Sequence, residues 1–289
     1  MSSETVEVPA PHRGTAAQQP RAGSHPDITG PQAPAPRPEA DDHRSREARL
    51  SAQLTQQRHV TVELQHAILP LHDEPFDLPG LRAAVRYLPA SYDSRVGGDW
   101  YITAELPSGL VLIAIGDVAG HGLAAAAGMA RLRGALAGLA ITGAPPQQLV
   151  GWLNELVSFV DPEHTSSVIA GYFDPATRLL RWAQAGHPPP VLVRGPRAWA
   201  LPQPDGILLG AGDREYLVAT QQLQAGDLLL LYSDGLVERR GQSIDDGLST
   251  LCTAACGATA PDAVIGTVLR AMASSATDDD TCLVALQVL

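Results

Sequence analysis

Hydrophobic and polar positions divide the chain into three regions. Residues 1–42 hold eight prolines and no aromatic residue. Such a segment has too little apolar surface to offset the entropy of ordering, so we predict a disordered tail. Residues 43–70 contain a stripe spaced alternately by four and three residues, which predicts a helix ending at Pro70. Residues 71–289 are expected to form one folded domain.

The stripe in the 43–70 helix leaves two interpretations open. Leu50, Leu54, Leu64 and Ile68 are apolar, but the stripe also includes two polar positions. The helix could dock on its own domain, or it could form a short coiled coil that dimerises or receives a signal.

After Pro79 the pattern predicts an α+β domain. Runs rich in β-formers are bounded by Gly, Pro and Asp turns and predict strands at 82–88, 100–106, 110–115, 168–173, 179–185, 191–193, 216–223, 227–232 and 281–288. Amphipathic runs predict helices at 123–140, 146–160, 247–255 and 261–274. Because strands and helices arrive in blocks, we expect antiparallel sheets covered by helices.

Composition excludes several classes of function. The net charge is -11, so we expect neither nucleic acid nor an anionic membrane surface as a partner. All 20 basic residues are arginine, which excludes Schiff-base chemistry and the lysine of a nucleotide-binding P-loop. The three cysteines are too few for a disulfide framework, and no apolar run is suited to a membrane span. A soluble, cytoplasmic protein is expected.

Acidic residues stand at the ends of apolar strands. Asp117 follows one such run, Asp234 follows another, residues 278–280 are all aspartate and precede a third, and Asp99 precedes a fourth. A carboxylate at a buried strand end is costly unless a positive charge meets it. Oxygen-only ligands without clustered His or Cys suit Mg²⁺ or Mn²⁺, which predicts metal-assisted hydrolysis of a phosphoester. Each acid alone also fits an ordinary turn.

Six segments together resemble the SpoIIE/RsbU branch of the metal-dependent protein phosphatases, and the resemblance covers about residues 60–289. In order, the segments are LQHAILP at 64–70, VGGDWY at 96–101, GDVAGHG at 116–122, AGHPP at 185–189, LYSDGLVE at 231–238 and DDDT at 278–281. Six motifs in register carry far more information than any one of them.

The resemblance implies a fold, a metal centre and ligand roles. The fold is a four-layer α/β/β/α sandwich, with two Mn²⁺ or Mg²⁺ ions at one end of two antiparallel sheets. Asp117 corresponds to the bridging ligand and the Val118 carbonyl to a further ligand. Asp234 and Asp278 correspond to ligands of one ion, and Asp99 to the acid that holds a water of the metal centre. Asp279 corresponds to an Asp or Asn beside the ligand Asp278.

The sequence departs from the family pattern at three positions. Asp280 stands where an apolar residue is usual, so the register within 278–280 is open. Ile102 replaces a usual acid, and Ile102→Asp is expected to raise activity or metal affinity if that corner is weakened. Ala119 stands where eukaryotic relatives have a histidine that can serve as general acid, which leaves the leaving-group acid unassigned.

The resemblance predicts the activity and its partners. The domain at 71–289 is expected to be the catalytic domain of a serine/threonine protein phosphatase. Its expected substrate is a phosphoserine on a regulatory protein, an anti-sigma-factor antagonist of STAS-like type. A homodimer through the 43–70 helix is a further expectation. The alternative, motivated by Ile102, is a catalytically weakened phosphatase-like module that only binds a partner. For His121 and His187 we favour hydrogen bonding to loops over proton transfer.

Overall fold

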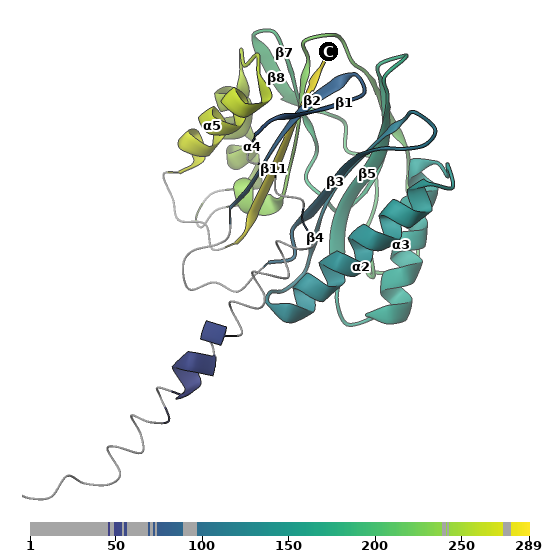
Figure 1. The fold of residues 1–289 in the computed structure, drawn as a ribbon, viewed down its shortest axis with the longest axis vertical. Helices are drawn as coiled ribbons and strands as arrows, with labels where there is room; N and C mark the ends of the chain where they lie inside the picture. Colours follow the sequence, from purple (N-terminus) through teal and green to yellow (C-terminus); the bar gives the residue numbers. More distant parts are fainter. Residues whose placement is uncertain are drawn as a thin grey trace, which may run out of the picture. The chain divides into compact units, whose positions relative to one another are not determined.

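Figure 1 shows the fold of the chain as a computed structural model. The structure describes residues 46, 49–53, 55–56, 69, 72, 74–88, 97–238, 241, 243–273 and 279–289. The predicted tail at 1–42 lies outside these residues. Within the predicted 43–70 helix, residues 46, 49–53 and 55–56 are helical, and most of the remainder lies outside the described residues. The predicted dimer contact through this helix stays a prediction.

Two antiparallel sheets form the centre of the domain. The first has the order β1-β2-β11-β10-β7-β8, and the second has the order β3-β4-β5-β6-β9. The strands of the first are β1 (Phe76–Leu78), β2 (Leu81–Leu88), β7 (Val191–Arg194), β8 (Arg197–Ala200), β10 (Leu228–Tyr232) and β11 (Thr281–Val288). The strands of the second are β3 (Trp100–Glu105), β4 (Val111–Val118), β5 (Ser166–Asp174), β6 (Leu179–Ala185) and β9 (Ala219–Gln222).

Two pairs of helices cover the outer faces of the sheets (Figure 1). Helices α2 (Leu123–Ala140) and α3 (Pro146–Val160) contact the second sheet, whereas α4 (Ile244–Ala255) and α5 (Pro261–Met272) contact the first. The predicted α+β class and the four-layer α/β/β/α sandwich are therefore confirmed. None of the helices in the described ranges is both long and apolar enough to cross a membrane.

The core explains why some strands are apolar without alternation. Every residue of β10 is buried, because the strand lies between the second sheet and the α4–α5 pair. Leu229 and Leu231 belong to the larger core cluster, while Leu228 and Leu230 belong to the cluster beneath α4 and α5. A strand buried on both faces gains from apolar side chains at every position.

The structure corrects several predicted boundaries. β1 and β8 were not predicted, and the strand expected at 216–223 is limited to β9. Helix α4 begins at Ile244 rather than at Gly247, because the Ser243 hydroxyl accepts a hydrogen bond from the Asp246 backbone while the Asp246 carboxylate accepts one from the Ser243 backbone. This capping box satisfies two backbone donors of the first turn. The predicted bounds of α2 and α3 are confirmed.

Candidate metal centre

Strand ends from both sheets bring the predicted acids to one edge of the sandwich. Asp99 precedes β3, whose first residue pairs with Gly116 of β4, directly before Asp117. Asp234 opens a short 3-10 helix after β10, and Asp279 precedes β11, which pairs with β10 at this same end. Asp99, Asp117, Asp234 and Asp279 thus interact electrostatically. Asp278 lies outside the described residues.

Ser233 joins the two sheets at this edge. It is fully buried, and its hydroxyl donates a hydrogen bond of 2.6 Å to Oδ2 of Asp99. The same hydroxyl oxygen accepts the backbone N–H of Cys282 at 2.9 Å. The Ser233 oxygen thus accepts the Cys282 N–H, and the proton of its own hydroxyl points to the Asp99 carboxylate. One carboxylate oxygen of Asp99 is thereby fixed by the protein, and Oδ1 is left for other partners.

The carboxylates disfavour one another's charge. Burial, and then the charge of Asp117, raise the pKa of Asp99 well above its ordinary value, although the Ser233 hydroxyl opposes this effect. Burial, followed by the charges of Asp234 and Asp279, raises the pKa of Asp117 to about 7. Burial and the charge of Asp279 also raise the pKa of Asp234. A site that holds carboxylates against this repulsion favours cations.

The donor set fits a hard divalent cation in its chemistry. Its side-chain donors are carboxylate oxygens, the ligands that Mg²⁺ and Mn²⁺ prefer. Within the described part of the chain, no three His, Cys, Asp or Glu side chains surround a common point as ligands of one ion would. The predicted ligand Asp278 is not among those residues.

Contacts with the loop before β3 and with β5 fix the positions of Asp117 and Val118. The Val118 N–H donates to the Gly98 carbonyl at 3.2 Å, and the Ser166 hydroxyl donates to the Asp117 carbonyl at 2.6 Å. A Cβ at Gly98 would overlap the Val118 carbonyl oxygen and lie 2.8 Å from Oδ1 of Asp117. Glycine at 98 therefore allows the loop to approach the predicted bridging ligand.

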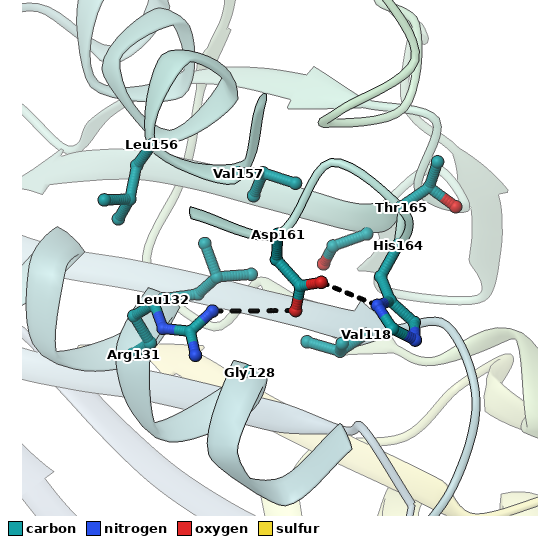
Figure 2. A pocket seen from close by; sticks show the side chains of 10 residues that line it. Val118, Gly128, Arg131, Leu132, Leu156, Val157, Asp161, His164 and Thr165 are labelled. Carbon is teal, nitrogen blue, oxygen red and sulfur yellow. Dashed lines mark hydrogen bonds and ion pairs between the residues drawn. The ribbon is translucent and has the colours of Figure 1, made fainter. Parts of the chain in front are cut away.

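A small pocket that Val118 helps to line lies between α2, α3 and the end of β4 (Figure 2). At its rim the Asp161 carboxylate lies 3.6 Å from Arg131 of α2 and 2.7 Å from His164. This pair of contacts holds the loop after α3 against α2. The next residue, Thr165, accepts the Ala119 N–H at 2.9 Å, so the loop also supports the segment that follows Asp117.

His187 connects the two sheets beneath the site. It is buried, its Nε2 lies 3.1 Å from the Tyr232 carbonyl, and its Nδ1 lies 2.7 Å from the Ser167 hydroxyl. Since a carbonyl only accepts, Nε2 carries the proton and Nδ1 accepts from Ser167. Burial lowers the pKa of His187 to about 3, so the ring is neutral. The geometry agrees with the predicted hydrogen-bonding role.

The acids before β11 divide into two environments. Asp279 is exposed and acts on Asp117 and Asp234 through its charge. Asp280 is buried, and its Oδ2 accepts a hydrogen bond of 2.6 Å from the Tyr87 hydroxyl. Of the two acids that the structure describes in 278–280, Asp280 is therefore the buried one and Asp279 the exposed one.

Ile102 is a core residue in this structure. It is 4% exposed, pairs with Ala114 of β4 and belongs to the larger hydrophobic cluster. An acid here would be placed among apolar side chains, which removes the physical basis for expecting Ile102→Asp to raise activity.

His121 lies exposed in the loop between β4 and α2.

Sequence reasoning missed the uncharged residues that hold the acids. Ser233, Ser166 and Tyr87 all donate hydrogen bonds at this edge. The sequence could have pointed to Ser233, because this residue directly precedes Asp234 at the end of an apolar run. It could not have pointed to Tyr87, since Tyr87 and Asp280 are 193 positions apart in the chain.

Known proteins resemble this chain in sequence and in fold. Phosphoserine phosphatase RsbU of Bacillus subtilis (strain 168) is 29% identical over 152 residues, which cover 52% of this chain and 45% of that protein. The RsbU and RsbW domains of Rv1364c from Mycobacterium tuberculosis are 30% identical with a TM-score of 0.67, over 73% of this chain and 60% of that chain. The chain thus spans about half the length of the curated relative.

A second solved structure extends the likeness of the fold. The catalytic domain of the serine/threonine protein phosphatase PstP, in complex with 2 manganese ions, has a TM-score of 0.51 and 19% identity, over 72% of this chain and 98% of that chain. The family model described as stage II sporulation protein E (SpoIIE) matches residues 107–289, more than half of the chain. This chain therefore belongs to the SpoIIE family.

Proposed function

We propose that the chain is a metal-dependent serine/threonine protein phosphatase that hydrolyses a phosphoserine on a regulatory protein. The observation that carries the proposal is the convergence of Asp99, Asp117, Asp234 and Asp279 from separate strand ends of two sheets. The names of the relatives support it, since RsbU is a phosphoserine phosphatase and PstP was solved with manganese.

Asp117, the Val118 carbonyl, Asp234, Asp278 and Asp279 would hold two Mn²⁺ or Mg²⁺ ions. Bound divalent cations lower the pKa of water and stabilise the charge of a phosphoryl group. Asp99 would orient a water, because Ser233 fixes Oδ2 and leaves Oδ1 as an acceptor. Gly98 brings its own loop against the Val118 carbonyl and so sets the separation of Asp99 from Asp117.

A covalent phosphoenzyme on cysteine does not suit this site. Cys282 lies nearest to the acids, but it is fully buried. Burial, and then the charge of Asp99, raise the pKa of its thiol well above the ordinary value. A thiol that stays protonated is a poor nucleophile, so direct attack by water on phosphorus is the proposed route.

Replacing a single ligand by its amide tests the proposed metal centre. Asp117→Asn and Asp234→Asn keep the shape of the side chain and remove its charge, so each is expected to lower Mn²⁺-dependent hydrolysis of p-nitrophenyl phosphate by roughly a hundredfold or more. Glu105→Gln, an exposed change at the far end of β3, is the matched control. Near-normal rates in either aspartate variant at saturating Mn²⁺ would refute the assignment.

The class of protein that serves as substrate is the more specific part of the proposal. Following the family resemblance, we propose a phosphorylated anti-sigma-factor antagonist of STAS-like type. Mass spectrometry of such proteins from the same cell, after incubation with the enzyme and Mn²⁺, would report loss of phosphate from serine. Hydrolysis of p-nitrophenyl phosphate without release of phosphate from any phosphorylated STAS-like protein would contradict this substrate and leave the proposed metal centre unaffected.

Ile102 no longer favours the alternative of a module that only binds a partner, because its side chain lies in the hydrophobic core.

A further inference from the structure

A buried serine at the start of β5 contacts the backbone of the residue proposed to bridge the two ions. Ser166 is 3% exposed, and its hydroxyl donates a hydrogen bond of 2.6 Å to the Asp117 carbonyl. The same hydroxyl lies 3.2 Å from the Ser167 carbonyl, so the contact with Asp117 is the shorter one. The pairing of β4 with β5 ends at Val118 and Ser166. The hydroxyl therefore holds the backbone of β4 where the regular ladder stops.

The position of Ser166 is itself fixed from the other side. Its N–H donates to the Leu209 carbonyl at 3.2 Å, and the Leu209 N–H donates to the Ser166 carbonyl at 2.9 Å. The residues that follow Leu209 are held by Asn154 of α3, which is 4% exposed. Oδ1 of Asn154 accepts the Gly210 N–H at 2.8 Å, and Nδ2 donates to the Gly212 carbonyl at 3.0 Å. The hydroxyl of Ser166 thus acts from a backbone that is anchored to α3.

The peptide unit between Asp117 and Val118 is held at both of its polar atoms. Its carbonyl accepts the Ser166 hydroxyl, and its N–H, which belongs to Val118, donates to the Gly98 carbonyl at 3.2 Å. A peptide unit is planar, so two hydrogen bonds on opposite sides fix the orientation of the whole plane.

The next peptide unit carries the carbonyl that is proposed to bind a cation. Its N–H belongs to Ala119 and donates to the Thr165 carbonyl at 2.9 Å, which lies at the start of β5. In a trans peptide the C=O and N–H bonds point in opposite directions, so the Val118 carbonyl points away from β5. The closeness of Gly98 to this carbonyl oxygen agrees with that direction. Contacts from adjacent residues of β5 thus set the direction of the Val118 carbonyl.

We propose that Ser166 is a positioning residue of the metal centre, whose hydroxyl holds the Asp117 carbonyl and thereby keeps the Val118 carbonyl directed toward the cation. The inference rests on the proposed function. Groups that orient metal ligands without touching the ion contribute to its affinity, because a ligand that is already oriented loses less freedom on binding. A hydrogen bond with a merely structural role would stabilise the metal-free chain and leave the affinity for the ion unchanged.

The test is calorimetric binding of Mn²⁺ to the full chain, combined with thermal unfolding of the metal-free protein. Ser166→Ala removes the hydroxyl, so we expect the Mn²⁺ dissociation constant to rise about tenfold. Ser166→Thr keeps a hydroxyl on the same carbon atom and is expected to bind Mn²⁺ as the parent does. Ser166 lines the small pocket between α2 and α3, which accommodates the added methyl group.

Tyr172→Phe is the matched control on the same strand. Tyr172 is 3% exposed, and its hydroxyl donates to the Ala144 carbonyl at 3.0 Å, so this change also removes a buried hydrogen bond from a hydroxyl to a backbone carbonyl. The residue lies toward the opposite end of β5 from Ser166. We therefore expect a lower unfolding temperature, as in Ser166→Ala, but an unchanged Mn²⁺ affinity.

Unchanged Mn²⁺ affinity in folded Ser166→Ala would overturn the inference. An equal loss of affinity in Tyr172→Phe would also overturn it, because the effect would then follow from lower stability. The same holds for an equal loss in folded Ser166→Thr, since the hydroxyl would not be responsible. If Ser166→Ala does not fold, Ser166→Cys, which has nearly the same shape and only a weak donor, is judged by the same criteria. Failure of both to fold would show that the hydroxyl serves the fold, and would count against the inference.

The parent chain separates this inference from the proposed function. If the parent binds Mn²⁺ and hydrolyses p-nitrophenyl phosphate while Ser166→Ala binds Mn²⁺ equally well, only the Ser166 inference fails. If the parent neither binds Mn²⁺ nor hydrolyses the ester, both fail.

Discussion

Ser233 shows how one uncharged side chain can control a charged site. Its hydroxyl donates to Asp99 and accepts from the Cys282 N–H, both in a fully buried environment. Ser233→Ala would leave the N–H and a carboxylate oxygen without these partners, at a cost of about 1–3 kcal/mol in the free energy of unfolding. Chemical denaturation measures this loss.

Loss of the Ser233 hydroxyl should also reduce the turnover number at saturating Mn²⁺, since Asp99 would be free to rotate. Ser249→Ala, an exposed serine on α4, is the control and should change neither stability nor rate. If Ser233→Ala turned over at the parent rate despite its lower stability, Asp99 would not need this hydroxyl for its orientation.

Ile102 carries a second prediction at the residue scale. The side chain is 4% exposed within the hydrophobic core, so Ile102→Asp would bury a charge among apolar neighbours. We expect a loss of several kcal/mol in stability and no gain in Mn²⁺ affinity. Thermal unfolding and calorimetry measure the two quantities. A stable variant with tighter Mn²⁺ binding would restore the interpretation that this position belongs to the site.

The ligand acids could be predicted from the sequence, but the residues that hold them could not. Each acid follows or precedes an apolar run, and a strand end is a local feature that one sequence reveals. Which strand ends meet depends on sheet order, and only the resemblance supplied that. The burial of Asp280 and its contact with Tyr87 depend on β2 pairing with β11, which links positions far apart in the chain.

At the element scale, His187 joins β10 of one sheet to β5 of the other. Its ring donates to the Tyr232 carbonyl and accepts from Ser167, so it works as a neutral connector. His187→Gln cannot reproduce both contacts from the same backbone position. We expect the unfolding temperature to fall, by an amount equivalent to about 1–3 kcal/mol.

The pH dependence of the rate distinguishes a connector from a proton donor. Because burial lowers the pKa of His187 to about 3, the ring does not titrate between pH 5 and 8, and its loss should leave the shape of the pH–rate profile unchanged. Disappearance of a limb of that profile in His187→Gln, with the fold intact, would assign the ring to proton transfer.

Helices were predicted more closely than edge strands for a physical reason. Helices α2 and α3 begin after turn-forming or proline residues and carry long apolar faces, so their limits are local. β1 has three residues and β8 four, with half-buried and exposed positions, and such short edges depend on their partner strands. The start of α4 was misjudged because the Ser243 capping box precedes its apolar face.

At the scale of the whole molecule, the crowded carboxylates should reverse the pH dependence of stability when metal is added. Burial and neighbouring charges raise the pKa values of Asp99, Asp117 and Asp234, that of Asp117 to about 7. The metal-free folded state therefore binds more protons than the unfolded state from about pH 4 to pH 7, and by linkage its stability falls as pH rises through this window.

Divalent cations should give the opposite slope, because they compete with protons for the same oxygens. At a fixed, subsaturating Mn²⁺ concentration we expect the unfolding temperature to rise from pH 5 to pH 7, while in a chelator it falls. The difference in this slope between the parent and Asp117→Asn isolates the contribution of Asp117 from that of the other titrating groups, since the amide cannot take up the proton. If the parent in chelator and Asp117→Asn showed the same slope, the raised pKa of Asp117 would make no contribution to stability. If Mn²⁺ left the slope of the parent unchanged, these carboxylates would not be where the cation binds.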